Sequence, residues 1–218
     1  MNFIKSTNFS YLGDRSYVHS TSIIKFIHDN ISVFVDNRST CHYLDIKMHK
    51  EMNTNCRVDI YSKYHEYVVE SVICEVILKS DEYTKFIYFL SYHKPVKQDA
   101  VDNDNLYSIK EISSYGKFSG SYRISSNSYS EYITNIIQSN KLLHLKNLDS
   151  KRFKILNIFM KNVPVEFSEF TNTSDIEIKN IGIRDAINGD YSTLNSVKIA
   201  GIDIQPILIG FQVKELNV

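Results

Sequence analysis

The chain has 218 residues, of which 43% are hydrophobic and 23% are charged. These are the proportions of a globular protein that can bury a core, so global disorder is excluded. Lys and Arg together number 25, and so do Asp and Glu. A balanced charge lacks the broad positive field that duplex nucleic acid or an anionic membrane would attract.

The N-terminal residues and the cysteines narrow the class further. Residues 1–14, MNFIKSTNFSYLGD, lack the apolar core of a signal peptide, and no apolar run approaches the roughly 20 residues needed to cross a bilayer. Cys41, Cys56 and Cys74 form an odd number without a CxxC spacing, which is against a disulfide framework or a zinc ribbon. We expect a soluble, cytoplasmic protein with no metal site and no tightly bound cofactor.

The first half of the chain predicts one helix. Residues 20–30, STSIIKFIHDN, place Ile23, Phe26 and Ile27 on a single helical face. Ser20 or Ser22 is the expected N-cap, because a serine hydroxyl can accept a hydrogen bond from a free backbone N–H.

Strand patterns follow this helix. Residues 42–64 alternate between apolar and polar side chains and are interrupted by the turn-prone Asn-Thr-Asn at 53–55. Residues 66–80 and 81–93 read as a β-hairpin with Asp81 and Glu82 in its connection.

The second half repeats this order. Ser128 and Glu131 match a capping box, and the stripe behind them predicts a helix that extends through residue 145; the stripe consists of Tyr129, Tyr132, Ile133, Ile136 and Ile137. Residues 152–167 read as strand with a break near Pro164, and residues 175–183 and 197–213 supply further strands.

Each half therefore reads as strand, helix and three strands, which predicts an α+β protein built of two repeats. We place the repeats at 1–98 and 99–218, with the polar, turn-rich residues 94–105 joining them. The alternative is a single α+β domain without an internal repeat.

This order of elements resembles the hotdog fold, in which antiparallel strands wrap a central helix. Residues 11–27, YLGDRSYVHSTSIIKFI, are similar to the segment that leads into the hotdog helix, and residues 43–60, YLDIKMHKEMNTNCRVDI, are similar to the two strands after it. Two copies would make a double hotdog, with a central helix in each repeat, over nearly the whole chain.

Within that superfamily the chain resembles the leinamycin-type acyltransferase/decarboxylase family. The resemblance depends on Gly13, Asp14 and Tyr17 before the helix and on Tyr43 and Leu44 on the next strand, whereas the tryptophans of the family pattern are missing. It implies a substrate carried by acyl-CoA or acyl carrier protein in polyketide or fatty-acid-type biosynthesis.

The dehydratase branch of the superfamily offers a second comparison. Its helix is preceded by a stretch resembling His-Phe-Pro-Gly, with the histidine as base. Residues 11–14 read Tyr-Leu-Gly-Asp and residues 117–120 read Lys-Phe-Ser-Gly, so neither half has the histidine at that position. We therefore do not expect a dehydratase mechanism.

The start of the first helix is the predicted site. A helix N-terminus offers unpaired N–H groups and a partial positive charge that can polarise a thioester carbonyl. The candidate catalytic residues are Asp14, Tyr17, His19 and Ser20: His19 as base, Asp14 to orient it, Ser20 as an oxyanion contact and Tyr17 as acid or nucleophile. In the second half Ile124 takes the position opposite His19, an asymmetry expected either of one working and one degenerate site or of drift in a non-catalytic protein.

Two arginines are the candidate contacts for the substrate carrier. Arg15 and Arg123 could bind the phosphates of CoA or of phosphopantetheine. The sequence thus favours an enzyme that transfers, decarboxylates or hydrolyses an acyl thioester, as a monomer or a homodimer. A non-catalytic protein of the same fold that binds an acyl ligand or a protein partner remains the alternative.

Overall fold

The computed structural model describes residues 2–4, 7, 9–11, 18–35, 43–66, 71–95, 97–98, 109–114, 120–126, 129–145, 153–165, 174–185, 190–199 and 201–215. The chain divides into two compact units, which are residues 1–105 with 163–167, and residues 106–162 with 168–218. The first is called unit 1 and the second unit 2. That the units are copies of each other, with repeats at 1–98 and 99–218, stays a prediction.

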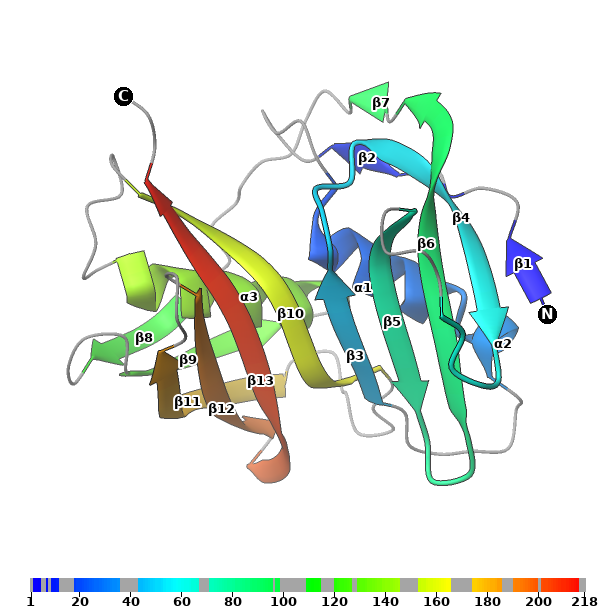
Figure 1. Ribbon diagram of the computed structural model, residues 1–218. Coiled ribbons are helices and arrows are strands. Elements are labelled where there is room, and N and C mark those ends of the chain that lie inside the picture. The colour runs from blue at the N-terminus through cyan, green and yellow to red at the C-terminus, as the bar shows by residue number, and fades with distance from the viewer. Residues whose placement is uncertain are drawn as a thin grey trace. The chain divides into compact units, whose positions relative to one another are not determined.

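Unit 1 is a helix packed on an antiparallel sheet (Figure 1). Its helices are α1 (Ser20–Asp29) and the single turn α2 (Ile31–Phe34). The strands follow the order β1-β4-β6-β5-β3, with bounds β1 Asn2–Ile4, β3 Tyr43–Met48, β4 Thr54–Tyr61, β5 Val72–Lys79 and β6 Thr84–Pro95. A parallel pair, β2 (Ser10–Tyr11) with β7 (Lys97–Gln98), completes the unit.

Apolar side chains of α1 and of the sheet form the core of unit 1. Ile23, Ile24 and Ile27 of α1 are fully buried, as predicted from the helical pattern for Ile23 and Ile27. The ring of Phe26 packs edge-on against Phe89 of β6, with 6.0 Å between the ring centroids. On the sheet the buried positions alternate along β3 and β5, because successive side chains of a strand point to opposite faces.

Unit 2 has the same kind of architecture with different strand pairing. Its helix is α3 (Tyr129–Leu145). Its strands follow the order β10-β13-β12-β11-β9-β8, with bounds β8 Ile109–Ser114, β9 Gly120–Ser126, β10 Phe153–Pro164, β11 Ser174–Asp185, β12 Asp190–Ile199 and β13 Ile202–Glu215. The predicted strand end at Pro164 is confirmed by the end of β10.

The last two strands of unit 2 form a tight hairpin. Ile199 of β12 pairs with Ile202 of β13, which leaves a two-residue loop, and Gly201 in that loop has φ 84°. Glycine suits this position because a side chain is strained at positive φ. The stretch 197–213, read as strand from its pattern, is therefore two strands joined at Gly201.

The two sheets differ in where their last two strands lie. In unit 2 the strands β11, β12 and β13 pair in chain order. In unit 1 the predicted hairpin of β5 and β6 is confirmed, but β6 also pairs with β4. The sheet order is therefore β4-β6-β5, so the strand that comes last in the chain lies between the two that precede it. The two units thus place similar strands in different orders within the sheet.

Candidate active site

The site predicted at the start of α1 begins with His19. This residue is the N-cap, with extended backbone angles of φ −77° and ψ 151°, and its carbonyl oxygen accepts hydrogen bonds from the N–H groups of Ser22 at 3.0 Å and Ile23 at 3.3 Å. The prediction that Ser20 or Ser22 caps the helix is wrong by one residue or more, since Ser20 is already its first helical residue. His19 and Ser20 are both partly exposed.

A short backbone bridge fixes where α1 starts. The N–H of Val18 donates to the carbonyl of Met52 at 2.7 Å, and both side chains are buried. Nearby, the N–H of Cys56 donates to the Thr7 hydroxyl at 2.8 Å, and the N–H of Phe9 donates to the side-chain oxygen of Asn55 at 2.9 Å. The start of α1 is therefore held against the segment that leads into β4.

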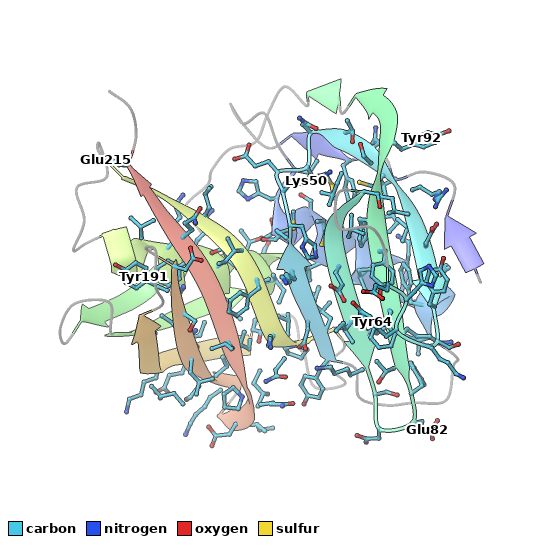
Figure 2. All side chains as sticks on the ribbon, viewed as in Figure 1. Lys50, Tyr64, Glu82, Tyr92, Tyr191 and Glu215 are labelled. Carbon is cyan, nitrogen blue, oxygen red and sulfur yellow. The ribbon has the colours of Figure 1, made fainter. Side chains whose placement is uncertain are left out.

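Ionisable side chains lie on this same segment and on β5. His49 follows β3, and its Nε2 lies 3.6 Å from Oε2 of Glu75, with about 20% of each side chain exposed. Lys50, labelled in Figure 2, is the next residue and is exposed. His49 and Glu75 thus form a pair of acid–base side chains in unit 1.

The two described cysteines are not nucleophiles at neutral pH. Burial raises the pKa of Cys56 to about 12, an effect that the charge of Lys50 only partly offsets. Burial also raises the pKa of Cys74 well above the usual thiol value, and Cys56 and Glu75 add to that effect. Because the thiolate is the reactive form, covalent catalysis by these two thiols is not favoured.

The other predicted site residues lie either outside the described residues or in unit 2. Asp14, Arg15 and Tyr17 lie outside the described residues. The backbone of Arg123 lies on β9 in unit 2, where it pairs with Glu177 of β11. Ile124 also lies within β9 and pairs with Ile176, so it is a strand residue and does not correspond to the N-cap His19.

Sequence reasoning missed a group of buried polar side chains in unit 2. They come from α3, β11 and β12, and are Asn135, Ser139, Asn140, Asn180, Thr193 and Asn195. One signal was present: Asn135 and Ser139 are four residues apart and therefore share a helical face, and Ile136 and Asn140 repeat that spacing. The apolar stripe drew attention to its isoleucines alone.

Two absences apply to the described part of the chain. It contains no group of three or more His, Cys, Asp or Glu side chains that could hold a metal ion. None of its helices is long and apolar enough to cross a membrane.

The sequence matches no family model and no curated protein. Solved structures do match. A candidate thioesterase II from Thermobifida fusca YX has a TM-score of 0.55 at 6% identity, with 98% of this chain and 95% of that chain covered. The dehydratase domain of RzxB from Pseudomonas fluorescens has a TM-score of 0.52 at 10% identity, with 95% and 93% covered.

A third match carries the fold in its description. A conserved protein of unknown function with a hot dog fold, from Alicyclobacillus acidocaldarius, has a TM-score of 0.50 at 8% identity, with 91% of this chain and 88% of that chain covered. At such low identity the matches establish architecture and not activity. The chain has an α+β hotdog fold, as predicted.

Proposed function

We propose that the protein acts on an acyl thioester carried by CoA or by an acyl carrier protein, at the start of α1. The observation that carries the proposal is that His19 is the N-cap of α1, so a residue with an acid–base side chain directly precedes the first turn of the helix. Support also comes from the fold, since the similar hotdog structures include ones described as a thioesterase and as a polyketide synthase dehydratase domain.

Each group has a defined role in this proposal. The N–H groups of the first turn, with the Ser20 hydroxyl, polarise the thioester carbonyl and stabilise the oxyanion of the tetrahedral intermediate. His19 takes a proton from the attacking water or alcohol and returns it to the leaving thiolate of the carrier. Asp14 orients His19, Tyr17 serves as acid or nucleophile, and Arg15 binds the carrier phosphates.

Three reactions fit this machinery and differ in their products. Water as the acceptor gives hydrolysis, a second nucleophile gives acyl transfer, and a carboxylated acyl group can lose carbon dioxide. The last two are the reactions that the leinamycin-type resemblance implies. Identifying the product by mass therefore distinguishes the three reactions.

A binding protein of the same fold is the second candidate. Its support is specific: the stretches before both helices lack the dehydratase-type histidine, and both described thiols are buried and protonated. In that case the first-turn N–H groups of α1 would hold a thioester without turning it over.

Intact-mass spectrometry with a panel of acyl-CoAs and acyl carrier proteins tests the proposal. We expect wild type to consume at least one thioester, and His19→Ala to do so about 100-fold more slowly, since a positioned general base contributes about that much. Tyr17→Phe tests the predicted acid or nucleophile. His28→Ala, near the other end of α1 and 38% exposed, is the matched control and should retain full activity.

The remaining outcomes decide between the candidates. If His19→Ala consumed the thioester as fast as wild type, His19 would not be the general base. A thioester that is retained but never consumed would establish the binding protein, and a panel that is neither bound nor consumed would leave the hotdog fold standing without this function.

A further inference from the structure

The helix of unit 2 buries polar side chains, whereas the helix α1 of unit 1 does not. Six neutral polar residues of unit 2 are each at most 7% exposed; they are Asn135, Ser139 and Asn140 of α3, Asn180 of β11, and Thr193 and Asn195 of β12. By contrast, the buried residues of α1 are isoleucines alone. Buried polar groups are costly unless they are hydrogen-bonded, so each of the six needs its partners identified.

Some polar atoms of this group are satisfied by one hydrogen bond between the helix and the sheet and by others within the sheet. The hydroxyl of Thr193 donates to Oδ1 of Asn140 at 3.1 Å, which ties β12 to α3. The side-chain amide of Asn195 donates to the carbonyl of Thr193 at 3.3 Å and lies 3.4 Å from the carbonyl of Ile207 on β13. These contacts fix the orientation of the Asn195 side chain, so its Oδ1 points away from the carbonyl groups of Thr193 and Ile207.

Three polar atoms of the group have no hydrogen-bond partner among the described residues. They are Oγ of Ser139, Nδ2 of Asn180 and Oδ1 of Asn195. Ser139 and Asn195 are 0% exposed and Asn180 is 7% exposed, so bulk water does not reach them freely. An amide nitrogen donates, a carbonyl oxygen accepts, and a hydroxyl does both.

Asn180 and Asn195 are placed to share one ligand. They stand directly opposite each other in the pairing of β11 with β12, so both side chains lie on the same face of the sheet, with Cβ atoms about 5 Å apart. The pairing register shifts immediately after Asn180 in one ladder and immediately after Asn195 in the next. Such bulges re-aim side chains, and here they flank a donor and an acceptor that are not bonded to each other.

We propose that Ser139, Asn180 and Asn195 form an internal binding site for a water molecule. The water accepts a hydrogen bond from Nδ2–H of Asn180, donates one to Oδ1 of Asn195, and makes the third with Oγ of Ser139 on the facing helix. A buried water typically makes about three hydrogen bonds to otherwise unsatisfied groups. The six side chains are all neutral, so the site selects a neutral, water-sized ligand over an ion. This inference does not depend on the proposed function.

Water-to-protein cross-relaxation measured by NMR on the intact wild-type chain tests the site. We expect the Asn180 and Asn195 side-chain amide signals to show cross-peaks with a long-lived water, with the sign that slow tumbling gives. Asn180→Leu and Asn195→Leu identify the two signals by their loss. Ser139→Ala removes one ligand and should reduce the cross-peak to Asn180 at least twofold.

Ser192→Ala is the matched control, because it makes the same change on β12 at a position adjacent to Thr193 but on the opposite face. It should leave the cross-peak unchanged. A crystal structure should show the water about 3 Å from Nδ2 of Asn180 and Oδ1 of Asn195. A direct hydrogen bond between these two atoms, or a wild-type spectrum without the cross-peak, would overturn the proposal, and neither depends on a variant folding.

Discussion

At the residue scale, Asp59 is a charged side chain placed inside the protein. It lies on β4, is 0% exposed, and its Oδ2 accepts a hydrogen bond from Nη2 of Arg57 at 2.7 Å. Arg57 is two residues away on the same strand and therefore on the same face, with about half of its side chain exposed. A buried carboxylate depends on such a partner, because desolvation disfavours its charge.

We expect Arg57→Met to lower the free energy of unfolding by about 2 kcal/mol, since it removes a hydrogen bond from a half-exposed arginine to a buried carboxylate. Urea unfolding at pH 7 measures the change. Lys47→Met, which also replaces a basic side chain by methionine at an exposed position of β3, should change stability by less than about 0.5 kcal/mol. Equal effects of the two substitutions would show that the pair adds nothing.

The buried thiols make stability depend on alkaline pH. Their pKa values are raised in the folded protein from an unfolded value of 9.0, to about 12 for Cys56 and well upward for Cys74. The protonated thiol is neutral and is favoured by the fold. Above pH 9 the unfolded chain therefore loses protons that the folded chain keeps, and stability falls as pH rises.

For each thiol, the free energy of unfolding should fall by about 1 kcal/mol as the pH rises from 7 to 10. Unfolding curves over pH 7 to 10 measure this loss. The variant Cys56→Ala/Cys74→Ala should show a flatter curve, although burial also raises the pKa of Tyr88 and of Tyr129, so some slope remains at the highest pH. An identical slope in wild type and variant would contradict the assignment to the thiols.

At the element scale, β10 and β13 pack so closely that one residue has no room for a side chain. Gly210 of β13 stands opposite Phe159 of β10, just past a shift in their pairing register. A Cβ added to Gly210 would overlap the ring of Phe159. The Phe159 ring can lie directly over Gly210 because glycine has no side chain.

Gly210→Ala should therefore destabilise the protein by about 2 kcal/mol, as overpacking does. Phe159→Leu should restore most of that loss in the double variant, because it removes the ring atoms in the way. Thermal unfolding of the single and double variants measures the coupling. Gly182→Ala is the control, since its added Cβ would meet Leu194 at an ordinary 3.8 Å. Additive effects of the two changes at Gly210 and Phe159 would exclude the clash.

The elements themselves were largely predictable from local pattern. Helical spacing of apolar residues gave α1 and α3, and turn residues gave the β5–β6 hairpin. Strand order was not predictable, because it depends on pairings between residues far apart, such as Val58 with Phe89. The polar core of unit 2 was missed for a related reason: asparagine is usually exposed, and only the packing of α3 on β12 buries it.

At the scale of the whole molecule, charge balance controls association between chains. The formal net charge is +0 at pH 7 and the isoelectric point is about 7.0. Molecules without net charge repel one another least, so solubility should be lowest near pH 7 and higher at pH 5.5 and 8.5. Precipitation by polyethylene glycol at low ionic strength measures this. A solubility that changes in one direction across that range would contradict it.

The two strand orders imply that the units gain structure at different rates. In unit 2 the strands β11, β12 and β13 pair in the order in which they follow one another along the chain, and only a few residues separate each from the next. In unit 1 the strand β4 pairs with β6, and the whole of β5 lies between these two strands in the sequence. Closing the longer loop costs more entropy before any contact rewards it. During refolding, amide hydrogens of β12 should therefore become protected before those of β4, and the newly formed chain would expose the edge of β4 the longest.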